Sequence, residues 1–115
     1  MDILIVSPYW ADKILDGEKV WEIRGSSTKK RGRIAIAKSG TSCVFGEVSV
    51  EDAIPLTKAL WEENIDKHLV RCPWDLVLEK YKHPHAWIFE PNSGTRYETP
   101  KHYDHPKGAV IWVKG

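Results

Sequence analysis

Three ionisable side chains that lie close together in the sequence, Lys19, Glu22 and Arg24, are the residues most able to do chemistry. We expect residues 20–24 to form an exposed strand, in which Glu22 and Arg24 share one polar face because side chains alternate. Lys19 lies at the turn before this strand, so its long side chain can reach over that face. A base, an acid and a fixed cation can form the floor of a polar pocket. The same residues can also form a solvated strand face whose ion pairs contribute little to stability.

A longer pattern surrounds these three residues and carries a resemblance. Its parts are residues 7–11 (SPYWA), 14–19 (ILDGEK), 22–24 (EIR), 31–37 (RGRIAIA) and 105–113 (HPKGAVIWV). The pattern resembles the ASCH domain family, whose hallmark is a G-x-K-x-x-E-x-R segment followed by an R-G-x-hydrophobic hairpin strand. The resemblance implies a PUA-like fold and a role in RNA or nucleoside chemistry. It covers the first half of the chain well and the last residues moderately, while residues 55–100 match little.

The resemblance also implies a possible reaction. In the amidohydrolase branch of the family, which acts on acylated cytidines, the active site holds the motif Lys, a Thr three residues later and a carboxylate from a following helix. Lys19 matches the Lys and Glu63 (or Glu62) could supply the helix acid, but Glu22 stands at the Thr position. A carboxylate can activate water as a general base, yet it is a poorer acyl-transfer nucleophile than a hydroxyl. Lys19, Glu22 and Glu63 are therefore the candidate catalytic residues, and whether the protein is an enzyme stays open; RNA cleavage is a further alternative.

The charge distribution favours a nucleic-acid partner. The segment 24–38 contains six cations and no acid, namely Arg24, Lys29, Lys30, Arg31, Arg33 and Lys38. Such a local basic patch is typical of phosphate contact, although a solvated hairpin tip would look the same. Tyr9 and Trp10 fall in the first turn of the helix beside the expected pocket, where aromatic rings can stack on bases.

The expected secondary structure places these residues on a small mixed fold. Strands are predicted at 3–6, 20–24, 32–38, 42–52, 85–89 and 109–113, and helices at 8–16, 57–69 and 73–81, with an irregular loop at 91–108. Ser7, Pro8 and Gly17 give the first helix its start and stop signals. Strands and helices do not alternate as in parallel α/β proteins. We therefore expect an α+β fold, a small, mostly antiparallel PUA-like β-barrel with flanking helices, forming a single domain over residues 1–115.

Other features limit the alternatives. No segment approaches the ~20 apolar residues of a membrane span, and no charged-then-apolar leader opens the chain, so we expect a cytoplasmic protein without a membrane partner. The histidines His83, His85, His102 and His105 cluster in the sequence, but no Cys or carboxylate joins them in a familiar motif, so neither a metal nor a cofactor is expected.

The sequence therefore predicts an ASCH-type cleft that binds RNA or a modified nucleotide, floored by Lys19, Glu22 and Arg24. One alternative is a hydrolase of N4-acylated cytidine-type nucleosides, or a ribonuclease, at the same cleft. Another is a protein-interaction module that uses Trp74 and Tyr81 on an exposed helix. The nucleobase, the choice between RNA and DNA and the oligomeric state are not specified by these patterns.

Overall fold

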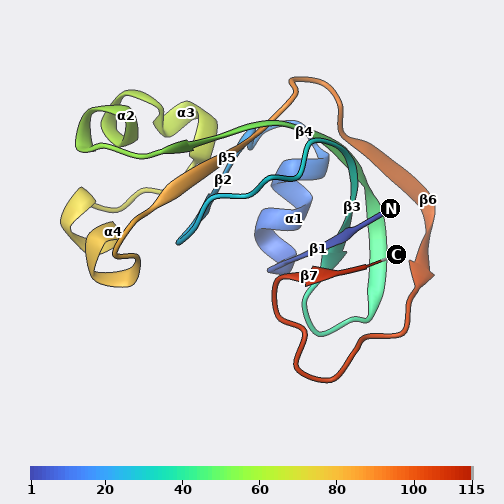
Figure 1. The fold of residues 1–115 in the computed structure, drawn as a ribbon. Helices are drawn as coiled ribbons and strands as arrows, with labels where there is room; N and C mark the ends of the chain where they lie inside the picture. The colour runs from blue at the N-terminus through green and yellow to red at the C-terminus, as the bar shows by residue number, and fades with distance from the viewer. Residues whose placement is uncertain (115) are drawn as a thin grey trace.

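The computed structural model describes residues 1–114, and its elements form one mixed sheet with four helices (Figure 1). In chain order the elements are β1 (Ile3–Val6), α1 (Pro8–Leu15), β2 (Trp21–Arg24), β3 (Gly32–Lys38), β4 (Cys43–Pro55), α2 (Lys58–Glu63), α3 (Ile65–His68), α4 (Trp74–Lys80), β5 (His85–Phe89), β6 (Thr95–His102) and β7 (Trp112–Val113).

Strand β4 is the central element of the sheet. Its first half pairs with β3 on one side and β6 on the other, and its second half pairs with β5. The strand order is β2-β5-β4-β3-β1-β7, and among the strands of the described residues only the β1–β3 pair is parallel. Within residues 1–114 the end strands β2 and β7 do not pair with each other, so the sheet is not the closed barrel that the sequence predicted. It bends where the register of β4 shifts, as bulges bend a strand.

Helix α1 packs on β3 and β4 and supplies the core with a buried stripe of Ala11, Ile14 and Leu15. Pro8 stands in its first turn, where no backbone N–H is needed. Gly17 has a φ of +83°, a conformation that favours glycine, and it lets the chain turn back toward β2 immediately after the helix. This turn sets the position of Lys19.

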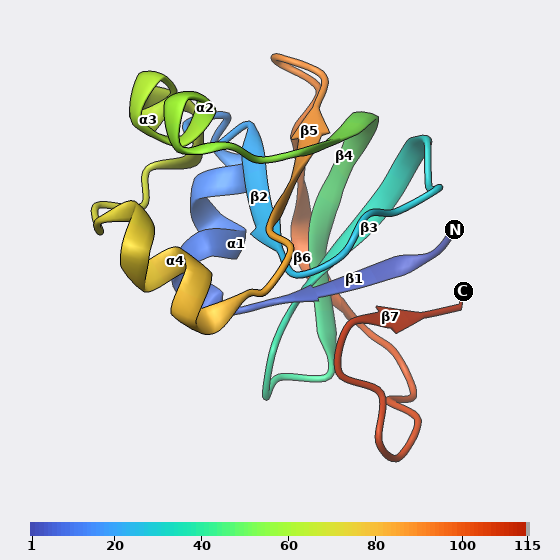
Figure 2. The same cartoon turned by 60° about the vertical axis from the view of Figure 1, so that its left-hand side comes forward.

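Helices α2, α3 and α4 lie together beside β2, away from β1 and β7 (Figures 1 and 2). They enclose a separate apolar cluster of Trp21, Ile23, Leu56, Trp61, Val77 and Ala86. Burial of this cluster holds the helices against β2. Among the helices of residues 1–114, none has the length and apolar character needed to cross a bilayer.

Several predicted elements need correction. Residues 20–24 are not an exposed strand, because Trp21 and Ile23 pack in the apolar cluster with Trp61 and Val77 and Glu22 is only 5 % exposed. The predicted helix 57–69 divides at Asn64 into α2 and α3, and the last strand is limited to Trp112–Val113. Residues 95–102, expected within a loop, form the exposed strand β6 on the edge of β4.

Candidate functional site

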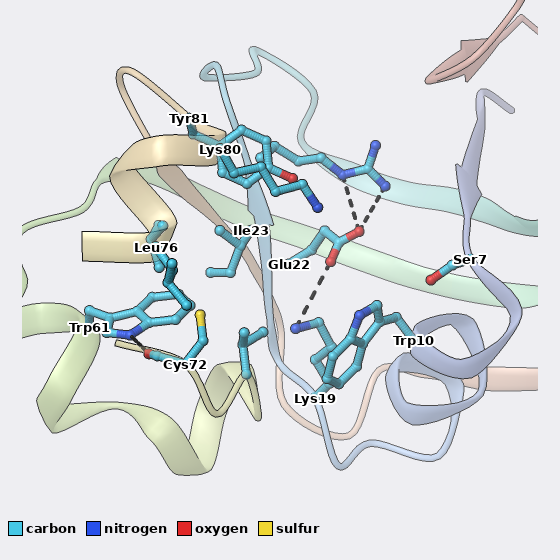
Figure 3. A pocket seen from close by; sticks show the side chains of 13 residues that line it. Ser7, Trp10, Lys19, Glu22, Ile23, Trp61, Cys72, Leu76, Lys80 and Tyr81 are labelled. Atoms are coloured by element: carbon cyan, nitrogen blue, oxygen red, sulfur yellow. Dashed lines mark hydrogen bonds and ion pairs between the residues drawn. The ribbon is translucent and has the colours of Figure 1, made fainter. Parts of the chain in front are cut away.

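A cavity of about 270 Å³ opens between β2, the start of α1 and helix α4 (Figure 3). One end is polar, with Lys19, Glu22 and Arg24, and the other is largely apolar. The complete lining consists of Ser7, Trp10, Lys19, Glu22, Ile23, Arg24, Trp61, Val70, Cys72, Leu76, Val77, Lys80 and Tyr81. Because polar and apolar groups meet in one concave space, the cavity has the character of a small-molecule site.

Lys19 is the most unusual residue of the cavity, because its side chain is charged in water yet only 1 % exposed here. Its ammonium donates a hydrogen bond to the backbone carbonyl of His68 and lies 4.3 Å from the centre of the Trp10 ring. The Lys19 Nζ and Glu22 Oε1 atoms are 4.0 Å apart. Burial lowers the pKa of Lys19 to about 8, while the Glu22 carboxylate opposes the shift and the Arg24 cation adds to it. The ammonium can therefore lose its proton close to neutral pH.

Arg24 fixes the carboxylate of Glu22. The Nε and Nη2 atoms of Arg24 donate to Glu22 Oε2 at 3.1 and 2.7 Å. Nη2 also donates to the backbone carbonyl of Ile5 at 3.1 Å, and the guanidinium lies 5.5 Å from the centre of the Trp87 ring. Oε2 is thus occupied by arginine, whereas Oε1 faces Lys19 and is the oxygen left to accept from a ligand.

His68 holds Lys19 in place through its backbone carbonyl, and the sequence analysis did not identify it as a site residue. Its imidazole is fully buried and stacks on Trp61, with ring centres 3.9 Å apart. The Val70 N–H donates to Nδ1 at 3.0 Å, so Nε2 carries the proton and donates to the Trp61 carbonyl at 2.8 Å. Burial lowers the pKa of His68, which keeps the ring neutral. These contacts fix the loop whose carbonyl receives the Lys19 ammonium.

The opposite end of the cavity is built by the helical segment. Val70, Cys72, Leu76 and Val77 line it with Trp61, and the Trp61 indole N–H is occupied by the Cys72 carbonyl at 2.9 Å. Tyr81 and Trp10 are half-buried rings that face the same space. A flat ligand can therefore contact aromatic and apolar surface while its polar edge meets Glu22.

The comparisons with known proteins identify the family. The sequence model of the ASCH domain matches residues 4–100, most of the chain, including Lys19, Glu22 and Arg24. This chain belongs to the ASCH domain family. A search of curated proteins finds no match.

Solved structures of another ASCH protein share the fold of this ASCH domain. The crystal structure of ZmASCH from Zymomonas mobilis has a TM-score of 0.72 at 15 % identity, covering 98 % of this chain and 87 % of that one. A Ser-to-Ala mutant of it gives 0.73 at 16 % identity with the same coverage. A Tyr-to-Phe mutant gives 0.68 at 17 % identity, covering 88 % of this chain and 74 % of the other. At such low identity the likeness establishes the fold alone.

The structure brings some of the predicted site residues of this ASCH domain together and leaves others apart. Lys19, Glu22, Arg24 and Trp10 line the cavity, whereas Tyr9, 63 % exposed, and Glu63, exposed at the end of α2, do not. The catalytic role of Glu63 and the stacking role of Tyr9 therefore lack support from the cavity and stay predictions.

The other five cations of the segment 24–38 do not line the cavity, and four of them are neutralised. Within residues 1–114, β2 and β3 do not pair, so this segment is not the hairpin that the sequence predicted. Lys30 pairs with Asp2, Arg31 with Asp52, Arg33 with Glu47 and Lys38 with Asp12, while Lys29 is exposed. The acids that pair with them come from distant segments, which a count of charges along the sequence cannot detect.

The structure also locates the aromatic pair of the predicted interaction helix and the clustered histidines. Trp74 and Tyr81 are half-buried and pack against the apolar cluster under α4. Among residues 1–114, no group of three or more His, Cys, Asp or Glu side chains is arranged to hold a metal ion. His85 lies on β5, and the His105 ring contacts Tyr103 and the Ala109 carbonyl.

Proposed function

We propose that this ASCH domain binds RNA or a modified nucleotide by taking one base into the cavity. The observation that carries the proposal is the combination found there: half-buried aromatic rings beside a fixed carboxylate oxygen, with three cations, Lys19, Arg24 and Lys80, in the lining. The ASCH family is generally linked to RNA binding, which agrees with this reading.

The geometry suggests a role for each group. Glu22 Oε1 can accept a hydrogen bond from an exocyclic amine, as acidic side chains do from cytosine. Trp10 and Tyr81 offer ring surface to a base, and stacking on aromatic rings contributes about 1–3 kcal/mol per base. Because Arg24 is tied to Glu22 and to Ile5, the carboxylate is held ready before the ligand arrives.

Binding can be followed by the fluorescence of Trp10 and Trp61, which both line the cavity. We expect one or more of the common nucleosides, nucleoside monophosphates or short single-stranded RNAs to bind, and Glu22→Gln and Lys19→Met each to weaken the complex about tenfold, the loss of one charged hydrogen bond. Lys13→Met is the matched control, because Lys13 pairs with Glu18 outside the cavity. If none of these ligands binds, or if Lys13→Met weakens binding as much as Lys19→Met, the proposal is wrong.

A second candidate function, hydrolysis of an N4-acylated cytidine, is favoured by one observation, the Lys19 ammonium 4.0 Å from Glu22 Oε1 in the lining of the cavity. In this reaction Glu22 would take a proton from water, the hydroxide oxygen would attack the acyl carbon, and Lys19 would stabilise the oxyanion. Glu22 would return its proton to the N4 nitrogen as the C–N bond breaks, which gives cytidine and a carboxylate. Incubation with N4-acetylcytidine, followed by chromatography, tests this directly. Release of cytidine and acetate that Lys19→Met and Glu22→Gln abolish would make the protein a hydrolase, while cleavage of an RNA oligonucleotide would indicate a ribonuclease.

A further inference from the structure

One face of helix α4 forms a wall of the cavity. Leu76, Val77 and Lys80 line the space, and their spacing places them on one side of the helix, while Tyr81 lines it from the position just after the helix ends. The acidic residues of α4, Asp75 and Glu79, are exposed and absent from the lining. The helix therefore presents to the cavity a cation, Lys80, and neither of its acids.

Lys80 differs from the other cations of the cavity because, within residues 1–114, no carboxylate lies within ion-pair distance of its ammonium. Lys19 and Arg24 both lie against Glu22, which is the single acid in the lining. Within residues 1–114, the Lys80 ammonium makes no ion pair, and its contact is with the neighbouring Tyr81 ring, 5.3 Å to the ring centre. The lining thus carries three cations against one carboxylate when Lys19 is protonated, and an anion is the complement that this surplus requires.

Lys80 is placed to bind an anion at the solvent-exposed edge of the cavity rather than in its interior. Its side chain is exposed and in Figure 3 extends from α4 toward the polar end of the cavity, where Glu22 lies. A phosphate bound there keeps part of its hydration while a base occupies the interior. Lysine suits this task, because its ammonium binds phosphate as a point charge on a flexible stem.

We propose that Lys80 binds a phosphate attached to the sugar of the bound nucleotide, so that the site prefers phosphorylated nucleotides to nucleosides. This inference rests on the proposed function, since it assumes that a base occupies the cavity. The phosphate can belong to a mononucleotide or to the backbone of single-stranded RNA. Both present the same group to the ammonium.

The test compares the four common nucleosides with their 5′-monophosphates, using the protein with Lys80, the variant Lys80→Gln and the control Lys82→Gln. Lys82 lies two residues further along, is exposed and does not line the cavity. We expect the best monophosphate to bind about tenfold more tightly than its nucleoside, a typical gain for one charged contact. Lys80→Gln should reduce this ratio to nearly one, and Lys82→Gln should keep it.

The outcomes separate the two proposals. Equal affinity for nucleoside and monophosphate, or equal losses in Lys80→Gln and Lys82→Gln, would overturn the role of Lys80 while leaving base binding intact. Failure of nucleosides, monophosphates and RNA to bind at all would overturn both. A single-stranded oligoribonucleotide without terminal phosphates distinguishes the sources: if its affinity depends on Lys80, the bound phosphate belongs to the RNA backbone, and if only monophosphates show the dependence, it belongs to a free nucleotide.

Discussion

At the scale of single residues, Lys19 couples ligand binding to pH. Its pKa of about 8 lies below the ordinary 10.5 because the ammonium is buried. We therefore expect affinity for a nucleoside monophosphate to fall between pH 7 and 9, as Lys19 loses its charge, whereas an exposed lysine would stay charged over this range. Titration calorimetry at several pH values measures the effect. The Lys19→Met variant should bind more weakly and show no step, and an equally steep fall in Lys19→Met would contradict the assignment.

The same shift affects stability, with a definite sign. Because the folded pKa of Lys19 is lower than the unfolded one, the unfolded chain binds more protons between about pH 8 and 10.5, and folding becomes more favourable as pH rises through this window. The full effect is roughly 3 kcal/mol, since each pKa unit corresponds to about 1.4 kcal/mol. Tyr97, whose pKa burial and Glu47 raise to about 12, acts in the opposite direction above pH 10. Urea unfolding of Lys19→Met should therefore lack the rise seen with Lys19 from pH 8 to 10.

The buried His68 makes the stability of the protein depend on pH in the acidic range. Burial lowers its pKa, the Lys19 charge lowers it further, and a hydrogen bond to the Trp61 carbonyl and the charge of Asp66 oppose the shift. The stability that neutral His68 contributes is present above pH 6.5 and is lost as pH falls below it. His68→Gln should lower the free energy of unfolding at pH 7.5 by about 1–3 kcal/mol, the cost of unsatisfied buried hydrogen bonds. In this variant the free energy of unfolding should also decrease less between pH 6.5 and 5. Replacement of exposed His83 by Gln is the control and should change neither quantity.

At the scale of elements, β4 can pair with both β3 and β6 because Gly46 has no side chain. A Cβ atom there would lie 2.3 Å from the Thr95 carbonyl oxygen and 2.8 Å from Leu15 Cδ2. Gly46→Ala should destabilise the protein by about 1–3 kcal/mol, the range of overpacked sites, and should expose the β6 amides to hydrogen exchange. Gly40→Ala, where φ is +83° and a Cβ meets nothing, tests backbone strain alone and should leave β6 protected. Unchanged exchange at β6 in Gly46→Ala would contradict this account.

The elements also show what the sequence can specify. The strand Ile3–Val6 and the helix that begins at Pro8 follow from local signals, a short apolar run and helix-start residues, and both are confirmed. Strand β6 was missed because its exposed residues carry no apolar alternation and include Pro100, so that only its partner β4 defines it. The burial of Glu22 was missed for a related reason. An acid is rarely buried unless it is paired, and the ion pairs of Glu22 with Lys19 and Arg24 exist only in the folded structure.

At the scale of the whole molecule, charge is distributed so that the cavity and the basic segment 29–38 act differently. Lys30, Arg33 and Lys38 have acidic partners, and screening at physiological salt weakens any field beyond about 8 Å. We expect Lys38→Ala to change affinity for a nucleoside monophosphate less than twofold, because its ion pair with Asp12 is structural. Lys29 is exposed and has no acidic partner among residues 1–114, so it remains available to a longer ligand.

Single-stranded RNA therefore gives the sharper test of the basic segment 29–38. Each phosphate contact with a single strand contributes about −0.7 to the slope of log affinity against log salt concentration. Lys29→Ala should reduce the slope for an RNA oligonucleotide by about that amount if the segment 29–38 contacts RNA, and should leave monophosphate binding unchanged. Lys80→Gln should reduce both the RNA slope and the affinity for a monophosphate, since the phosphate that Lys80 binds lies next to the bound base. If the RNA slope responds to Lys80 and not to Lys29, recognition is confined to the cavity and the cations of the segment 29–38 serve the fold. A response to Lys29 alone would place the RNA on this segment and leave the cavity to another ligand.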